Sequence, residues 1–250
     1  NYCEERGAAA YSLNASVTSN LTLSYASSNT SVATVAANGT VTVKAAGTTT
    51  LTVSQAENAN YNAATSVTQV LAVAVPAPVV VAATINGTVG STLSASINAT
   101  NSPTSYVVAS GILPTGLSLN VTSGRISGTP TTATTSGTLV VVRAANKSGS
   151  GKGNITFNIA KGSQTISGVK ASIAKSVGAA AYSLNASVKS KLKLSYASSN
   201  TRVATVAANG TVTVKAAGTT TLIVKQVGNT NYKAATSVKQ VLTVAAAFPN

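Results

Sequence analysis

The chain has 250 residues, with 17 lysine and arginine side chains, three acidic ones, no histidine and a formal net charge of +14. The acidic residues are all glutamates, so a Ser-His-Asp triad, a paired-carboxylate hydrolase site and a His- or carboxylate-based metal site each lack their parts. This composition argues against an enzyme, and it predicts neither a bound metal nor any cofactor.

The positive charge is concentrated toward the C-terminus. Residues 1–77 carry two basic and three acidic side chains, residues 78–160 carry four basic ones, and residues 161–250 carry eleven basic and no acidic ones. Such an asymmetry favours an acidic partner or surface for the C-terminal part. It is equally compatible with lysines that only keep an outward face in solution, and the sequence leaves both interpretations open.

The N-terminal part predicts a β-sandwich built from short strands. Residues 32–35 and 40–43 alternate between apolar and polar side chains and are joined through Asn38 and Gly39. An Asn-Gly pair between such alternations is a strong hairpin signal, because both residues of the tight turn must accept positive φ. A third strand is predicted at residues 49–53.

A further strand-like pattern lies just before this hairpin. Ser19, Leu21, Leu23 and Tyr25 alternate with polar residues over residues 18–25. Successive side chains of a β-strand point to opposite faces, so we expect these four to point inward and the others toward solvent.

Two prolines interrupt the longest apolar run, residues 70–83. A membrane-spanning helix needs about 20 apolar residues, so this run is too short for one. We interpret it as the last strand of one domain, a linker that contains Pro76 and Pro78, and the first strand of the next domain. No membrane span is predicted.

The N-terminal pattern occurs twice. Residues 7–73, the first repeat, return as residues 178–244, the second repeat, with a constant offset and no gaps. Over residues 8–73 the copies differ at twelve positions, and the second repeat carries Lys or Arg at seven of them. A repeat of this length is a unit with its own small core, so we predict an all-β chain of three serial sandwich domains that form a rod. The predicted domains are residues 1–75, 79–160 and 163–246.

The segments ahead of the two repeats differ. Residues 163–177 predict an opening strand for the second repeat, whereas only six residues precede the first repeat. Either the sequence is a piece of a longer protein, or the first repeat is short of a strand. Among those six residues, Cys3 is the single cysteine of the chain, so it cannot form an internal disulfide.

A sandwich short of a strand exposes backbone groups to which another chain can add a strand. We therefore expect self-association or contact with neighbouring repeats, head to tail. The apolar residues 241–248 are a candidate donor strand.

Two motifs of the first repeat carry a resemblance to a known family. SSNTSVATVAANGTVTV at residues 27–43 and NYNAAT at residues 60–65, with their counterparts in the second repeat, resemble the bacterial immunoglobulin-like repeats of secreted and surface proteins. KGSQTI at residues 161–166 resembles the usual opening strand of such a repeat. The resemblance implies immunoglobulin-like sandwiches that serve as stalks, spacers or adhesin segments.

The middle segment resembles a different immunoglobulin-like domain. LPTGLSL at residues 113–119 and GRISGTP at residues 124–130 are similar to the immunoglobulin-like, cadherin-like domain of bacterial surface proteins, and residues 144–151 fit its late hairpin. In physical terms, Pro114 presets φ for a turn that Gly116 closes.

These observations lead to two functional hypotheses. The first is a non-enzymatic structural repeat of an extracellular or cell-surface bacterial stalk, adhesin, sheath or filament. The second is a binding module whose Lys-rich third domain holds an anionic polymer, an acidic polysaccharide or a nucleic acid. Its candidate residues are Lys189, Lys191, Lys193 and Lys225, the first three on one predicted strand about 7 Å apart. Lysine is a flexible point charge, so we expect such binding to be loose and sensitive to salt.

Overall fold

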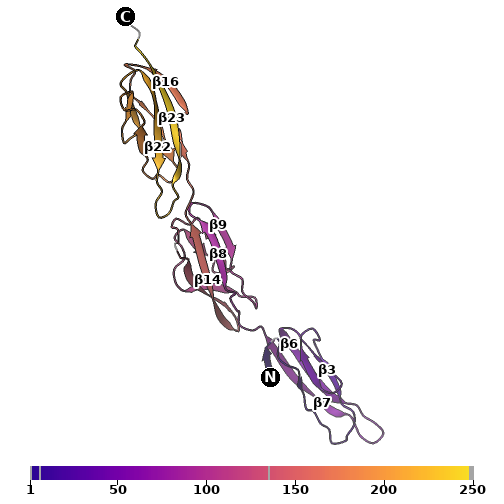
Figure 1. Ribbon diagram of the computed structural model, residues 1–250. Helices are drawn as coiled ribbons and strands as arrows, with labels where there is room; N and C mark the ends of the chain where they lie inside the picture. The colour runs from indigo at the N-terminus through magenta and orange to yellow at the C-terminus, as the bar shows by residue number, and fades with distance from the viewer. Residues whose placement is uncertain (1, 6, 135, 248–250) are drawn as a thin grey trace.

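The computed structural model describes residues 2–5, 7–134 and 136–247. In this described part every regular element is a β-strand, and no helix suited to cross a bilayer is found there. The strands gather into three groups that follow one another in chain order along an extended rod (Figure 1). The predicted all-β class and the rod of serial sandwiches are confirmed.

The first repeat consists of two packed sheets. Its strands are β1 (Tyr2–Glu5), β2 (Tyr11–Ser12), β3 (Ser24–Ser27), β4 (Ala33–Val35), β5 (Thr40–Val43), β6 (Gly47–Gln55) and β7 (Ala64–Ala74). One sheet has the order β1-β7-β6-β3 and the other has the order β2-β5-β4. Alternating Val and Leu side chains of both sheets meet between them, with Val41, Leu51 and Leu71 fully buried.

The middle segment forms a second pair of sheets. Its strands are β8 (Ala83–Thr88), β9 (Leu93–Ser96), β10 (Ser105–Ser110), β11 (Leu117–Leu119), β12 (Arg125–Gly128), β13 (Thr138–Asn146) and β14 (Gly149–Ala160). The sheets have the orders β10-β13-β14-β8 and β11-β12-β9. Phe157, Ile126 and Val140 are at the centre of the core between them. The turn predicted at Pro114 is present, because the Leu117 N–H donates to the Pro114 carbonyl and Gly116 has a φ of 92°.

The second repeat has the strands of the first and an additional pair. Its strands are β15 (Ile166–Ser167), β16 (Ser172–Ser176), β17 (Tyr182–Ser183), β18 (Ser187–Val188), β19 (Ser195–Ser198), β20 (Ala204–Val206), β21 (Thr211–Val214), β22 (Gly218–Gln226) and β23 (Ala235–Ala245). The sheets β16-β23-β22-β19 and β17-β21-β20 match those of the first repeat, and β15 and β18 pair with each other.

The start of the first repeat differs from the prediction. Tyr2 lies opposite Leu71 in the parallel pair of β1 and β7, as Ile173 lies opposite Leu242 in the pair of β16 and β23. The edge of β7 is therefore covered by the chain's own N-terminal residues, and the interpretation that the first repeat lacks its whole opening strand is wrong. The residues that would correspond to β15 fall before residue 1 of the sequence.

The prediction that residues 241–248 serve as a donor strand is also wrong for most of this segment. Val241 to Ala245 are part of β23, which lies inside its sheet between β16 and β22. A strand that is paired on both sides has no free backbone groups to offer another chain. Phe248, the end of the candidate segment, lies outside the described residues.

The predicted hairpin is present, but its turn differs. Residues 36–39 connect β4 and β5, with the Gly39 N–H donating to the Ala36 carbonyl at 2.9 Å. Gly39 has a φ of 81° and its counterpart Gly210 a φ of 84°, whereas Asn38 is not among the described residues with positive φ. The turn is a four-residue loop in which glycine alone has the left-handed conformation. The Asn38 side chain instead accepts a hydrogen bond from the Thr40 N–H at 3.0 Å.

The predicted strand at residues 18–25 exists only at its end. Residues 18–23 lie outside the strands, and β3 begins at Ser24. Burial nevertheless alternates as expected, with Ser19, Leu21 and Leu23 half-buried and their neighbours exposed. The segment is extended and has an inner and an outer side, although it does not pair with a strand.

We predict that replacing Gly39 with alanine lowers the local stability of the first repeat by about 1 kcal/mol or more. The left-handed backbone strains any Cβ, and an added Cβ would lie 3.1 Å from the Tyr25 ring. Hydrogen exchange of the β5 amides measures the free energy of opening. Ala37→Ser, an exposed change in the same loop, is the control and should shift it by less than about 0.5 kcal/mol. Equal effects of the two variants would contradict the role of Gly39.

The boundaries at residues 75, 79, 160 and 163 remain predictions, and core variants test them. Leu51 and Leu222 are counterparts at the centres of separate cores. Truncating either to alanine should destabilise its own unit by about 2–5 kcal/mol. We expect Leu51→Ala to accelerate hydrogen exchange within residues 1–75 and Leu222→Ala to do so within residues 163–246. Acceleration that spreads from Leu51→Ala beyond residue 79 would place the boundary elsewhere.

Candidate functional site

The described residues give little support for catalysis. They contain no group of three His, Cys, Asp or Glu side chains that could hold a metal ion. Three Ser-x-x-Lys matches have the spacing of a Ser–Lys nucleophile pair. Ser167 and Lys170 of the first match are both exposed. In the second match Lys175 is half-buried and Ser172 is exposed, and in the third Ser190 is half-buried and Lys193 is exposed. The Ser190 hydroxyl donates to the Gln164 side chain, and the Lys175 ammonium lies 5.4 Å from the centre of the Tyr182 ring.

The four lysines of the polymer-binding hypothesis, the lysine face, are all exposed. Lys189, Lys191 and Lys193 lie in the connection between β18 and β19, so their predicted placement on one strand is wrong. Lys191 has a φ of 58°, and its N–H donates to the Val188 carbonyl at 3.0 Å in a tight turn. Lys225 lies on β22 opposite Ser195, the first residue of β19.

The basic substitutions share one structural property. Each of the seven positions at which the second repeat has Lys or Arg in place of a neutral residue is exposed: Lys189, Lys191, Lys193, Arg202, Lys225, Lys233 and Lys239. The buried Val and Leu side chains are the same in both repeats. The same core therefore carries two different outer surfaces.

A second candidate site is the contact between the middle segment and the second repeat. The loop at residues 229–233 holds residue 162 between two backbone hydrogen bonds of 2.9 Å, from the Gly162 N–H to the Asn231 carbonyl and from the Lys233 N–H to the Gly162 carbonyl. The Asn231 side-chain oxygen accepts from the Ala133 N–H at 3.0 Å. The Tyr232 ring packs against the core of the middle segment. Backbone, side-chain and apolar contacts thus fix this junction.

Gly162 leaves room for this contact. A Cβ on Gly162 would lie 3.0 Å from the Tyr232 ring and 2.6 Å from the Val89 carbonyl oxygen. The chain leaves the middle segment with its backbone directly against the tyrosine.

The equivalent loop of the first repeat, residues 58–62, has the same fold but a different environment. The Asn58 side chain accepts from the Asn60 and Tyr61 N–H groups at 2.9 Å, as Asn229 does from Asn231 and Tyr232. Tyr61 is 53% exposed, whereas Tyr232 is half-buried. The same preformed loop is thus presented to solvent in one repeat and seated on another domain in the other.

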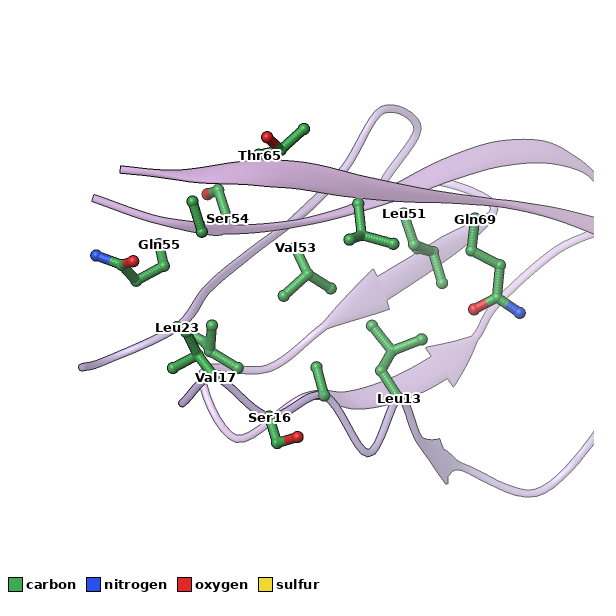
Figure 2. Close-up of a pocket in the computed structure, with 13 residues that line it drawn as sticks. Leu13, Ser16, Val17, Leu23, Leu51, Val53, Ser54, Gln55, Thr65 and Gln69 are labelled. Atoms are coloured by element: carbon green, nitrogen blue, oxygen red, sulfur yellow. The ribbon is translucent and has the colours of Figure 1, made fainter. Parts of the chain in front are cut away.

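A groove lies beside this loop in the first repeat. It has a volume of about 330 Å³. Figure 2 shows Leu51 and Val53 of β6 pointing toward Leu13 and Val17 on the other side of the opening. Val67, one of the lining residues, is 67% exposed. We call this cavity, with its thirteen lining residues (Figure 2), the acceptor groove.

The contact of the loop at residues 229–233 with the middle segment was not predicted from the sequence, and neither was the acceptor groove. Tyr61 and Tyr232 belong to the same Asn-Tyr motif, and the differences beside it, such as Lys233 in place of Asn62, do not predict which tyrosine contacts another domain. A signal for the groove was present, however. Gln164 and Ile166 precede the second repeat, and no residue of the sequence corresponds to them ahead of the first.

Comparison with known families assigns all three parts of the chain. Residues 14–57 and 192–227 match the family described as "Intimin, immunoglobulin-like domain". Residues 72–160 match the family described as "Putative Ig domain". No curated protein matches the chain.

Solved structures similar to the chain include strings of extracellular domains. Drosophila N-cadherin EC1-3 is 12% identical, with 98% of each chain covered and a TM-score of 0.31. Drosophila OTK extracellular domains 3–5 are 12% identical, with 98% of this chain and 94% of that chain covered and a TM-score of 0.34. The endo-fucoidan hydrolase MfFcnA4 from glycoside hydrolase family 107 is 15% identical, with 90% of this chain but 39% of that chain covered and a TM-score of 0.35. No functional statement rests on likenesses this distant.

The family matches agree with the fold and with the motifs of each part. The N- and C-terminal matches cover the two near-identical sandwiches, and the third match covers the sandwich between them. Domains of these kinds are typical of surface adhesins. The resemblance to bacterial immunoglobulin-like repeats is confirmed: the two repeats match the intimin immunoglobulin-like family, and the segment between them matches a different immunoglobulin family.

Proposed function

We propose that the chain is a structural spacer in an extracellular rod on a bacterial surface, where it holds other parts of an adhesin or filament away from the cell. The observation that carries this proposal is the junction at residues 229–233. A rod can bear load or set a distance only if its domains are held in a fixed relation. Neighbouring repeats, joined head to tail, are the partners that this function requires.

The Tyr232 contact is suited to this task for a physical reason. Domain interfaces within a chain are usually small and polar, so relative motion is the default expectation. Here an aromatic side chain of one unit packs on the core of the next, with backbone hydrogen bonds on both sides of Gly162. Bending at the junction would expose the ring and break these hydrogen bonds together.

Substitution of Tyr232 tests the proposal, with Tyr61 as its matched control. Tyr232→Ala should remove the apolar contact and make the rod bend between the middle segment and the second repeat. We expect small-angle scattering to give a shorter mean end-to-end distance and a broader distribution for Tyr232→Ala. Tyr61→Ala, in the same loop of the first repeat, should leave the scattering unchanged. A Tyr232→Ala chain as extended as the native one would contradict a rigid spacer set by this contact.

The lysine face supports a second candidate function, weak binding of an anionic polymer. Asn20 of the first repeat has a φ of 53°, and its counterpart Lys191 has a φ of 58°. Asparagine tolerates this left-handed conformation better than lysine does. The change from Asn to Lys is therefore unfavourable for the backbone, so stability does not explain it. Contact with an acidic polysaccharide would explain the presence of lysine at this position.

The first repeat supplies the replacement residues for a variant that tests this second function. Lys189→Thr, Lys191→Asn, Lys193→Thr and Lys225→Ser restore the residues of the first repeat on the same core. We expect this fourfold variant to lose most of the affinity of the native chain for heparin or polyglutamate. Native binding should also weaken steeply as salt is raised from 50 to 200 mM, because counterions are released on binding. Unchanged affinity of the fourfold variant would exclude the lysine face as the site.

A further inference from the structure

The outer face of the larger sheet distinguishes the two repeats. In the second repeat this sheet has the order β16-β23-β22-β19. Buried residues such as Val224 and Leu242 alternate with more exposed ones along β22 and β23, so the residues between the buried ones point away from the core. Four of the twelve differences between the repeats fall on this outer face: Ile223, Lys225, Lys239 and Thr243 replace Thr52, Ser54, Thr68 and Ala72.

Three lysines form a diagonal row on this outer face. Lys239 of β23 is directly opposite Ile223 of β22, and Lys225 is two residues further along β22. Lys225 is in turn opposite Ser195, the first residue of β19, and Lys193 is two residues before Ser195. Exposed and half-buried residues continue to alternate through this segment, so Lys193 is on the same side as Ser195. Diagonal neighbours in a sheet are about 7–8 Å apart, so the row advances in even steps.

A fourth lysine lies at the β16 end of the row. The Gln240 side chain, next to Lys239, donates to the Lys170 carbonyl at 3.0 Å, and the Val241 N–H donates to the Ala171 carbonyl at 2.8 Å. These bonds hold the segment ahead of β16 alongside β23, and Lys170 is exposed. We call Lys170, Lys193, Lys225 and Lys239 the lysine row. It shares two members with the lysine face and extends across the sheet.

The charge of the lysine row is not balanced within its own unit. Residues 161–250 contain no acidic side chain. Like charges on neighbouring strands repel each other, so the row lowers folding stability. The strands β3, β6 and β7 of the first repeat contain no charged residue and form the same sheet. The sandwich therefore does not need the row, and a bound polyanion would relieve the repulsion.

The composition of the outer face favours a polysaccharide over a nucleic acid. Thr219, Thr221 and Thr243 supply hydroxyl groups beside the row, and a hydroxyl both donates and accepts hydrogen bonds. In the described strands β16, β23, β22 and β19, none of the outward residues is aromatic. Single-stranded nucleic acids are held largely by stacking of bases on aromatic rings. Lysine also lacks the planar fork with which arginine recognises phosphate.

We propose that a linear polysaccharide with carboxylate or sulfate groups binds along the lysine row, on the outer face of β23 and β22. The ammonium groups of Lys239, Lys225 and Lys193 contact its anionic groups, and the threonine hydroxyls bond the sugar hydroxyls beside them. Because β22 and β23 run along the length of their unit (Figure 1), the polymer crosses the rod obliquely. This inference rests on the second candidate function, and it adds Lys239, Lys170 and the direction of the polymer.

Removal of row lysines tests the proposal on the full chain. Lys225→Ser with Lys239→Thr restores two residues of the first repeat, and the control, Arg202→Ser with Lys233→Asn, restores two others and removes the same charge. Lys233 takes part in the domain junction through its backbone groups, which asparagine also has. We expect the row variant to bind heparin and polygalacturonate about tenfold more weakly, with a salt dependence reduced by about one unit of slope per lysine. The control should bind as the native chain does. Equal losses in the two variants would overturn the proposal, because net charge alone would then determine binding.

The single variant Lys239→Thr separates the lysine row from the lysine face. Weaker binding than that of the native chain supports the row. Unchanged affinity of Lys239→Thr, together with a loss in the fourfold variant described above, would overturn the row and leave polymer binding in place. A native chain that binds neither polysaccharide would overturn both. The scattering test of the spacer function is independent of all these outcomes.

Transfer of the row to the first repeat is the converse test. Thr22→Lys, Ser54→Lys and Thr68→Lys add the three counterparts, and a control chain with Thr18→Lys, Ser31→Arg and Asn62→Lys adds the same charge. All six new residues occur at the equivalent positions of the second repeat, whose core is the same. We expect the transferred row to bind a second heparin fragment per chain, measured with fragments too short to span two domains. The control chain should bind one fragment. Equal stoichiometry in the two chains would contradict the proposal.

Competition with single-stranded DNA identifies the class of polymer. Displacement of heparin by DNA only at higher concentrations than by polygalacturonate supports a polysaccharide ligand. Tighter binding of the DNA, reduced by Lys239→Thr, would make a nucleic acid the ligand of the row and would overturn the assigned chemistry.

Discussion

The structure depends on small apolar cores. Among the described residues, the cluster of the first repeat contains six buried ones, all aliphatic: Val32, Ala33, Val41, Leu51, Leu71 and Val73. Small domains bury a low fraction of their surface and have little stability to spare. Each additional apolar side chain that reaches such a core from outside is therefore a large fraction of what holds the unit together.

The core of the middle segment uses such an outside contribution, because Tyr232 of the second repeat packs on it. Ile166 of β15 is buried among the Val and Leu side chains of its own unit, the second repeat. Stability and end-to-end order are linked at this junction, because separating the two units would expose apolar surface of Tyr232 and of the middle segment.

Sequence analysis correctly predicted features that depend on residues close together in the chain. It was wrong where a feature depends on contact between segments that are far apart in the sequence. The alternation of apolar and polar residues correctly predicted that Leu21 and Leu23 point inward. Burial depends on the direction of the side chain, whether or not the segment forms hydrogen bonds with a neighbouring strand. It could not show that residues 18–23 have no partner strand, since pairing depends on the neighbouring segment. Gly39 was assigned the correct conformation, but Asn38 was not, because a four-residue loop and a two-residue turn accept the same Asn-Gly pair.

The candidate functional residues could also be predicted only where local sequence determines their environment. The exposure of Lys189, Lys191 and Lys193 was predictable from the pattern, because each replaces an outward residue of the first repeat. The different environments of Tyr61 and Tyr232 were not, because the differences beside them, Lys233 in place of Asn62 and Gly228 in place of Glu57, do not signal the docking of a second domain. Comparing the two copies residue by residue in the structure makes that difference visible.

The asymmetry of the contact also determines the kind of assembly that these repeats can form. The loop that contains Tyr232 differs from the surface of the middle segment on which it packs. A contact between two unlike surfaces is directional, and repetition of it leads to an open row rather than to a closed pair. The chain contains one such contact, between the middle segment and the second repeat.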